Sequence, residues 1–326
     1  VTVLPVLAVM NVGKDNAFIK QVRKALAQEP CDCVVGFNRM PGLDVYYAAD
    51  RCLVDRYPER TIFYRISRRY RRRTAWERAS FGRDSTTEIM LIRSSEREHF
   101  QRLYGTPDDR FHDLPPNLDS KSLLPERYPE AGKAIRGEFN IPEDHQLVLM
   151  VGSGFRAKGL DRAVEALAAL PAASRETTTF LVVGRDRSAR YEKQAAAHGI
   201  ARRVIFTEGR DDVPRFYAAA DILIHPARTE NTGTVLLEAL VMGLPIIATD
   251  VCGFADHIVQ AQAGVVLPSP FRQEALNRAL ADLLGDAARR ASLADKARTY
   301  GETADFYGRY EKAADIIEAR ARRNRD

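Results

Sequence analysis

Short apolar runs alternate with longer amphipathic segments throughout the second half of the chain. The apolar runs have the length of buried strands, and the segments between them have the periodicity of helices. Strands that alternate with helices form a doubly wound parallel sheet with helices on both faces. The pattern therefore predicts an α/β domain over 141–303. Its predicted strands are 147–151, 179–183, 204–206, 221–224, 245–248 and 265–267.

The first half shows a sparser version of this pattern. Strand-like segments at 1–6, 33–37 and 88–92 alternate with helical segments near 16–27 and 50–80. This predicts a second Rossmann-like α/β domain over 1–140 that has too few strands at its start.

Two further segments concern the domain junction and the start of the chain. Residues 114–125 contain the prolines and polar residues typical of a domain junction. The chain has no initiator Met and begins inside predicted strand 1–6. We therefore expect either that a preceding segment is missing or that a non-standard start codon was read as Val.

Charge and cysteine content narrow the class of protein. The 49 Lys and Arg residues exceed the 44 Asp and Glu residues only slightly, which does not indicate a nucleic-acid-binding protein. The four cysteines form no Cys-x-x-Cys pair, which favours reduced thiols in a cytoplasmic enzyme over a zinc ribbon or a disulfide framework. No apolar run approaches the ~20 residues that span a bilayer. We expect a soluble or peripheral protein.

Two glutamates bracket the predicted loop that follows strand 221–224. Glu230 lies in the loop, and Glu238 lies about one turn into the next helix. Ligands of open α/β sheets bind outside the carboxyl ends of strands, and Gly233 and Thr234 are placed to offer backbone amides to an anion. The two carboxylates are then hydrogen-bond acceptors for ligand hydroxyls, such as those of ribose or a hexose. The alternative is that both are solvated, helix-favouring residues.

The segment Gly152-Ser-Gly-Phe-Arg-Ala-Lys-Gly159 joins a predicted strand to a helix. Ser153, Arg156 and Lys158 lie among glycines where a diphosphate requires amides and positive charge. Glycine-rich turns of this kind are also common as purely structural solutions. The chain contains no Asp-x-Asp motif, so we expect no metal ion, and cationic side chains would neutralise the diphosphate.

The region 51–83 is rich in arginine and aromatic residues. Read as one helix, the region has an apolar arc that consists of Ile62, Phe63, Ile66 and Tyr70. The arginines of the other arc are Arg65, Arg68, Arg69 and Arg72. This pattern favours contact with an anionic membrane surface, ahead of a merely solvated face and well ahead of binding to RNA.

Together, the Gly152–Gly159 loop, the glutamate pair and Gly243-Leu-Pro245 resemble the retaining GT-B glycosyltransferases. Within that group, the segment 35–50, Leu114-Pro-Pro116 and Val251-Cys-Gly-Phe254 resemble the lipopolysaccharide core glucosyltransferase I family. The resemblance implies two Rossmann-like domains facing a cleft: an acceptor-side domain over 1–140 and a donor domain over 141–303. It also implies that a helix at about 304–326 packs back on the first.

The resemblance further implies transfer of glucose from UDP-glucose to an inner-core heptose at the inner membrane surface. Catalytic roles fall on Asp50, which would face the acceptor, and on Glu230, which would hold the transferred sugar. Glu238 would hold the ribose, Lys158 would contact the diphosphate, and Gly233 and Thr234 would supply amides.

The sequence departs from the family in two places. Ala157 replaces the family's arginine before Lys158, so Arg156 would have to reach the phosphates. The family's first strands and their Gly-Gly loop have no counterpart before Val1. An alternative is therefore a truncated nucleotide- and lipid-binding module with little transferase activity, and another is a hexosyltransferase that uses a different UDP-sugar.

Overall fold

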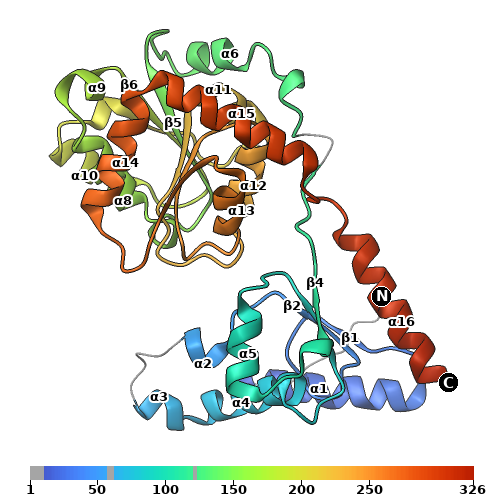
Figure 1. Cartoon of the computed structure of the whole chain (residues 1–326). Coiled ribbons are helices and arrows are strands. Elements are labelled where there is room, and N and C mark those ends of the chain that lie inside the picture. The colour runs from blue at the N-terminus through green and yellow to red at the C-terminus, as the bar shows by residue number, and fades with distance from the viewer. Residues whose placement is uncertain (1–10, 57–61, 120–122) are drawn as a thin grey trace. The chain divides into compact units, whose positions relative to one another are not determined.

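The computed structural model describes residues 11–56, 62–119 and 123–326. Contacts divide the chain into two compact units (Figure 1). The first unit comprises Val1–Pro115 with Gly308–Asp326, and the second comprises Pro116–Tyr307. The predicted strand 1–6 lies outside the described residues, as do residues 57–61 of the predicted helical segment 50–80.

A parallel sheet forms the centre of the first unit. Within the described residues its strands run in the order β1-β2-β3-β4. They are β1 (Val35–Gly36), β2 (Val45–Ala48), β3 (Glu88–Leu91) and β4 (Phe111–Asp113). The helices of this unit are α1 (Asn11–Gln28), α2 (Leu53–Arg56), α3 (Ile62–Ile66), α4 (Arg68–Phe81), α5 (Glu96–Tyr104), η1 (Asp108–Arg110) and α16 (Arg309–Arg325).

Both faces of this sheet are covered, because side chains of a strand point alternately to opposite faces. Tyr46 and Ile89 pack into a cluster with residues of α1, α4 and α5. Val45 and Met90 point to the opposite face, where they pack against α16. Figure 1 shows α16 and the α4–α5 pair on different sides of the strands. The sheet is therefore a buried central layer.

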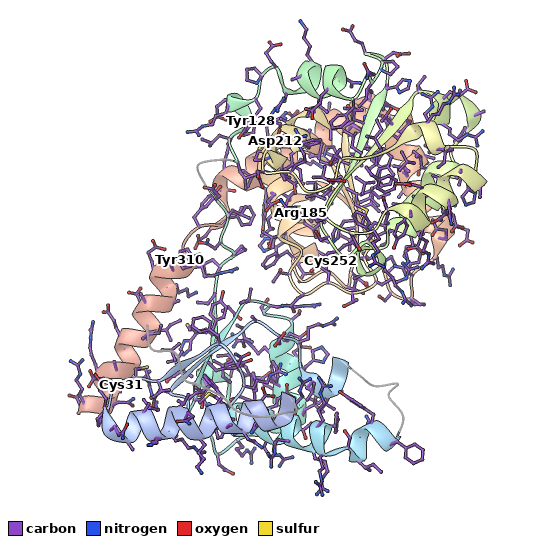
Figure 2. All side chains as sticks on the ribbon, turned by 180° about the vertical axis from the view of Figure 1, so that it is seen from behind. Cys31, Tyr128, Arg185, Asp212, Cys252 and Tyr310 are labelled. Atoms are coloured by element: carbon purple, nitrogen blue, oxygen red, sulfur yellow. The ribbon has the colours of Figure 1, made fainter. Side chains whose placement is uncertain are left out.

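Helix α16 is bound to the first unit by polar contacts as well as by apolar ones. Arg309 donates to the carbonyl oxygen of Pro115 at 2.8 Å. Arg323 pairs with Glu88 at 2.9 Å, and Arg320 pairs with Asp44 at 3.3 Å. Tyr310 of the same helix is exposed (Figure 2).

The second unit contains a larger parallel sheet. Its order within the described residues is β10-β9-β8-β5-β6-β7, so the direction of strand addition reverses between β5 and β8. The strands are β5 (Gln146–Val151), β6 (Thr178–Val183), β7 (Val204–Phe206), β8 (Ile222–His225), β9 (Ile246–Thr249) and β10 (Gly264–Leu267). The helices are η2 (Pro125–Arg127), α6 (Ala131–Glu138), α7 (Phe155–Lys158), α8 (Leu160–Ala168), α9 (Ala172–Glu176), α10 (Ala189–Ala197), η3 (Ala201–Arg203), α11 (Val213–Ala219), α12 (Thr234–Val241), α13 (Ala255–Ala261), α14 (Gln273–Gly285) and α15 (Ala287–Thr303).

Residues 116–140 belong to the second unit, whereas the sequence pattern predicts them in the first. The reason is packing: Glu138 at the end of α6 pairs with Arg210 at 2.8 Å, and the ring of Phe139 lies 6.0 Å from that of Phe216 on α11. Within the ranges that the structure describes, no helix combines the length and the apolar character needed to cross a bilayer.

The doubly wound α/β fold predicted from the sequence is confirmed. All six strands predicted for the second half are present, each within one residue of its predicted bounds. In the first unit, β2 and β4 were not predicted. The segment 62–72, read as one helix in the sequence, is instead broken at Ser67, which caps α4 by accepting a hydrogen bond from the amide of Tyr70 at 3.2 Å.

Candidate active site

The reversal of strand order brings two loops together at the carboxyl ends of β5 and β8. Crevices at such reversals are where open α/β sheets bind ligands. The loops are joined by a hydrogen bond from the amide of Arg228 to the carbonyl oxygen of Ala157, at 2.7 Å. Gly159 has a φ of +75°, and a Cβ there would overlap the carbonyl oxygen of Pro226. Glycine at 159 therefore allows the two loops to pack directly against each other.

Glu230 is the centre of a charged cluster at this point. Its Oε2 atom pairs with Nζ of Lys158 from the other loop and lies 3.3 Å from Nε2 of His225. Its Oε1 atom accepts a hydrogen bond from the amide of Asn231 at 2.9 Å. Burial acts to raise the pKa of Glu230, but His225 and Lys158 outweigh it and lower the pKa to about 2. The carboxylate is therefore ionised throughout the physiological range.

His225 is fully buried at the end of β8. Its Nε2 atom faces Glu230, and its Nδ1 atom has no hydrogen-bond partner among the described residues. The contact with His225 therefore helps to orient the Glu230 carboxylate.

Glu238 occupies a separate environment on α12. Its Oε2 atom accepts a hydrogen bond from the hydroxyl of Tyr217 at 2.6 Å. Burial raises the pKa of Glu238, and the Tyr217 hydroxyl opposes that effect. Tyr217 belongs to α11 and is itself buried, with a pKa raised well above the ordinary value. Tyr217 therefore fixes the direction of this carboxylate.

Helix α12 points its amino terminus at the same loop. Gly233, with φ 78°, lies at the N-cap position, and Thr234 is the first helical residue. Among the described residues no side chain caps this end. The amides of the first turn and the positive end of the helix dipole thus form an environment that stabilises an anion.

The chain matches known proteins over both units. The family model "Glycosyl transferases group 1" matches residues 132–300. The lipopolysaccharide glucosyltransferase WaaG of Escherichia coli (strain K12) is 42% identical over 315 residues, which cover 96% of this chain and 84% of that protein. The chain belongs to the group 1 glycosyltransferases.

Solved structures and a more distant relative agree with this. A crystal structure of WaaG, described as a glycosyltransferase involved in lipopolysaccharide biosynthesis, superimposes with a TM-score of 0.86, covering 96% of this chain and 85% of that one. The D-inositol 3-phosphate glycosyltransferase of Xylanimonas cellulosilytica is 34% identical over 209 residues, covering 62% of this chain and 50% of that protein. The expectation of a GT-B hexosyltransferase is confirmed.

Two other residues predicted to bind the donor, Ser153 and Arg156, lie in the segment between β5 and α8, which includes the short helix α7. Ser153 is exposed, and its hydroxyl accepts a hydrogen bond from the amide of Arg185 at 3.0 Å. Arg156 is exposed, and its carbonyl oxygen accepts from the guanidinium of Arg228 at 3.3 Å. Arg228 also forms a two-point contact with Asp161, at 2.6 and 2.7 Å. Sequence reasoning missed Arg228 and Asp161, because only the folded loops bring them together.

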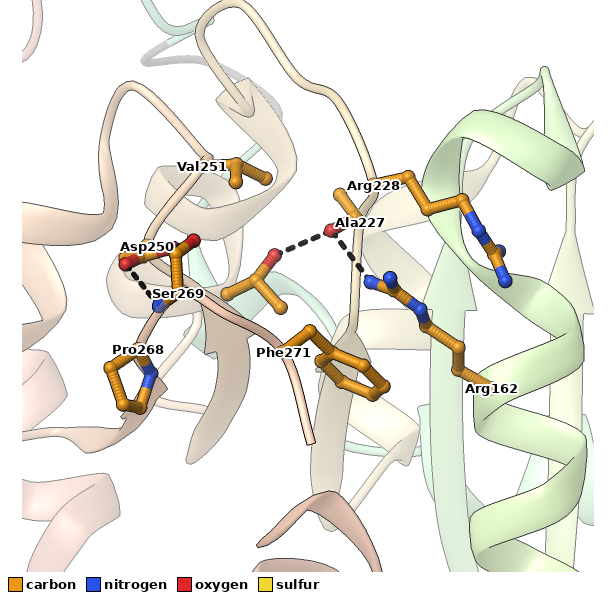
Figure 3. Close-up of a pocket in the computed structure, with 9 residues that line it drawn as sticks. Arg162, Ala227, Arg228, Asp250, Val251, Pro268, Ser269 and Phe271 are labelled. Carbon is orange, nitrogen blue, oxygen red and sulfur yellow. Dashed lines mark hydrogen bonds between the residues drawn. The ribbon is translucent and has the colours of Figure 1, made fainter. Parts of the chain in front are cut away.

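A pocket of about 170 Å³ lies at the carboxyl ends of β8, β9 and β10 (Figure 3). The guanidinium of Arg162 lies over the ring of Phe271, 3.7 Å from its centroid, and donates to the carbonyl oxygens of Pro226 and Ala227 at 3.1 and 3.2 Å. Thr249 also donates to Ala227, at 2.8 Å. These contacts hold the main chain of Pro226 and Ala227, just after β8.

The remaining predicted residues of the transferase belong to the first unit. Asp50 is exposed and follows β2, at the carboxyl edge of the smaller sheet. Arg65 lies on α3, and Arg68, Arg69 and Arg72 lie on α4; all four are exposed. Phe63 and Ile66 of α3 are 77% and 64% exposed. In the part of the chain that the structure describes, no group of three or more His, Cys, Asp or Glu residues is arranged to hold a metal ion.

Proposed function

We propose that this glycosyltransferase transfers glucose from UDP-glucose to a heptose of the lipopolysaccharide inner core, with retention at the anomeric carbon. One observation carries the proposal. The alignment with the E. coli lipopolysaccharide glucosyltransferase, at 42% identity, covers 96% of this chain. It therefore includes the unit with Asp50 as well as the unit with Glu230.

The donor roles follow from the charges around the two loops. Glu238 accepts hydrogen bonds from the ribose hydroxyls, and Tyr217 holds it in position. Glu230 accepts hydrogen bonds from the hydroxyls of the glucose. Because its pKa is lowered to about 2, it remains an acceptor at neutral pH.

The leaving group is a diphosphate, and its charge rises as the glycosidic bond breaks. Lys158 and the first-turn amides of α12 stabilise that charge, and Arg156 and Ser153 lie on the same loop. The bond between the anomeric carbon and the β-phosphate oxygen breaks while the acceptor oxygen bonds to the same face of that carbon. The acceptor proton passes to the departing phosphate oxygen, and the Asp50 carboxylate orients the acceptor hydroxyl. In this scheme no metal ion is required.

The test is a transfer assay with the whole chain, labelled UDP-glucose and heptose-terminated core lipopolysaccharide. We expect labelled lipopolysaccharide with UDP-glucose, little with UDP-galactose or UDP-N-acetylglucosamine, and equal rates with and without EDTA. Retention is read from the anomeric signal of the product by NMR. If UDP binds by calorimetry but no sugar is transferred from any donor, the chain is a nucleotide-binding module and the proposed activity is wrong.

We also propose that the transferase works at an anionic membrane surface, with α3 and the start of α4 as the contact. Exposed arginines near anionic lipid contribute about 1 kcal/mol each, and the exposed Phe63 and Ile66 add apolar burial. The double variant Arg65→Gln/Arg68→Gln should lose co-sedimentation with vesicles of phosphatidylglycerol. The control is Arg187→Gln/Arg202→Gln, which removes two exposed arginines from the second unit. If both double variants bind these vesicles equally well, this surface is not the membrane contact. The same conclusion follows if the unmodified chain binds neutral vesicles as well as it binds anionic ones.

A further inference from the structure

Buried charged side chains hold the main chain around Asp50. Asp50 lies in the segment 49–52 that connects β2 to α2, and Leu53 is the first residue of α2. Three charged side chains from other parts of the first unit reach this segment: Arg39 from the loop after β1, Glu77 from α4 and Glu96 from α5. Glu77 is fully buried, Glu96 is 5% exposed, and 13% of the Arg39 side chain is exposed.

Each of these side chains bonds to a main-chain group of the segment. Arg39 donates to the carbonyl oxygen of Asp50 at 3.1 Å and to that of Arg51 at 2.6 Å. Glu96 accepts from the amide of Cys52 at 2.9 Å. The next amide, that of Leu53 at the start of α2, donates to Glu77 at 2.9 Å. Four consecutive residues are thus held through their main chain.

The carboxylate of Glu77 also ties the arginine to the unit. Its Oε1 atom pairs with Arg39 at 3.1 Å, and its Oε2 atom accepts from the hydroxyl of Tyr104 at 2.6 Å. Burial raises the pKa of Glu77, whereas Arg39, Tyr104 and the Leu53 amide act to lower it. Buried ion pairs are poor sources of stability, since apolar residues of similar size often do as well. The contribution of the Arg39–Glu77 pair is a set of hydrogen bonds with fixed directions to the main chain of the segment.

We propose that Arg39 and Glu77 are positioning residues that set the main-chain conformation at Asp50 and thereby the direction in which its carboxylate faces the acceptor. The proposal rests on the proposed function, in which Asp50 orients the acceptor hydroxyl. This positioning role requires the planar guanidinium of arginine, because the guanidinium of Arg39 bonds at once to two carbonyl oxygens and to the Glu77 carboxylate. A lysine ammonium can keep the charge pair with Glu77 but not this geometry.

The kinetic test is a double-mutant cycle of Arg39→Lys and Asp50→Asn in the whole chain. We expect Arg39→Lys alone to lower kcat about tenfold, as loss of hydrogen bonds from a charged donor does, with the Kd for UDP unchanged. In the Asp50→Asn background, Arg39→Lys should have no further effect on kcat. The shift in melting temperature should be the same in both backgrounds.

Arg110→Lys is the matched control. Arg110 is also buried in the first unit and donates to the carbonyl oxygens of Ser80, Gly82 and Thr87, none of which belongs to the segment at Asp50. We expect it to lower the melting temperature without changing kcat at a temperature where the unit is folded. Equal multiplicative losses of kcat from Arg39→Lys in both backgrounds would show a general structural role and overturn the proposal. Normal turnover by Asp50→Asn would do the same.

A second measurement does not depend on transfer. The thiol of Cys52 is fully buried in the bound segment. Its alkylation by a maleimide, quantified by peptide mass spectrometry under native conditions, should accelerate at least tenfold in Arg39→Lys and in Glu77→Gln, but not in Arg110→Lys. If the unmodified chain transfers no sugar, the proposed function fails, and this rate still decides whether the pair holds the segment. An unchanged alkylation rate of Cys52 in both Arg39→Lys and Glu77→Gln would show that the pair does not hold the segment.

Discussion

Replacing Glu230 with glutamine tests the charge cluster at the carboxyl ends of β5 and β8. Glutamine has the size of glutamate but no charge, so Lys158 loses its ion pair while packing is retained. In the folded protein the pKa of Glu230 is lowered from 4.5 to about 2. A lowering of this size corresponds to about 3 kcal/mol of stability at neutral pH.

The sign of the pH dependence follows from the direction of this shift. A carboxyl group with a depressed folded-state pKa contributes its full stability above its unfolded value of 4.5, and the contribution is lost as the pH falls toward 2. The free energy of unfolding of Glu230→Gln should therefore lie below that of the unmodified chain by up to about 3 kcal/mol at pH 7. The difference should fall to less than half of that near pH 3, roughly one unit above the folded value.

The assay is urea denaturation of the unmodified chain and of Glu230→Gln at pH values from 3 to 8. Unfolding is monitored with a probe that reports on the second unit. Glu192→Gln is the control, because Glu192 is exposed on α10 of the same unit. It should differ from the unmodified chain by no more than ~0.5 kcal/mol at any pH. A difference for Glu230→Gln that stays constant from pH 3 to pH 8 would refute the assignment of this stability to an ionised Glu230.

Three further substitutions test the donor site. Tyr217→Phe removes the hydrogen bond to Glu238 and should weaken UDP binding about tenfold by calorimetry, whereas Tyr191→Phe should not. Lys158→Met should also raise the Kd for UDP at least tenfold, with a smaller salt dependence of binding; an unchanged Kd would remove Lys158 from the diphosphate site. Gly159→Ala should lower stability by about 3 kcal/mol or more in thermal unfolding, because its Cβ would overlap the Pro226 carbonyl in a left-handed conformation; a shift below 1 kcal/mol would contradict this packing.

The sequence predicted the second unit better than the first for a physical reason. Strands buried on both faces form continuous apolar runs, and β5 and β6 are runs of this kind. In the first unit, the unpredicted strand β4 has three residues and contains His112 and Asp113. A run this short and polar has no distinct periodicity, and it becomes a strand by pairing with β3.

The candidate site likewise contains residues that the sequence predicted and contacts that it did not. Glu230 and Lys158 were found because each lies in a loop next to a clear strand, but their direct ion pair was not predicted, since they are far apart in the sequence. Tyr217 lies on the buried side of α11, where an aromatic residue indicates only packing. Its role depends on one hydroxyl that meets Glu238 in the folded unit, and a single sequence holds no signal of that contact.

The two units position their key carboxylates by opposite means. Glu230 is held through its own side chain, by Lys158 and His225, so a ligand that draws Lys158 to its phosphates also frees an oxygen of Glu230 for sugar hydroxyls. Asp50 is exposed and is held through its main chain, by Arg39, so its side-chain oxygens stay available. Under the proposed donor roles, binding exchanges an existing ion pair, which would favour a ligand that supplies a phosphate to Lys158 and hydroxyls to Glu230. UDP would supply only the phosphate, because its ribose hydroxyls are assigned to Glu238, so the exchange would favour the nucleotide that still carries its sugar.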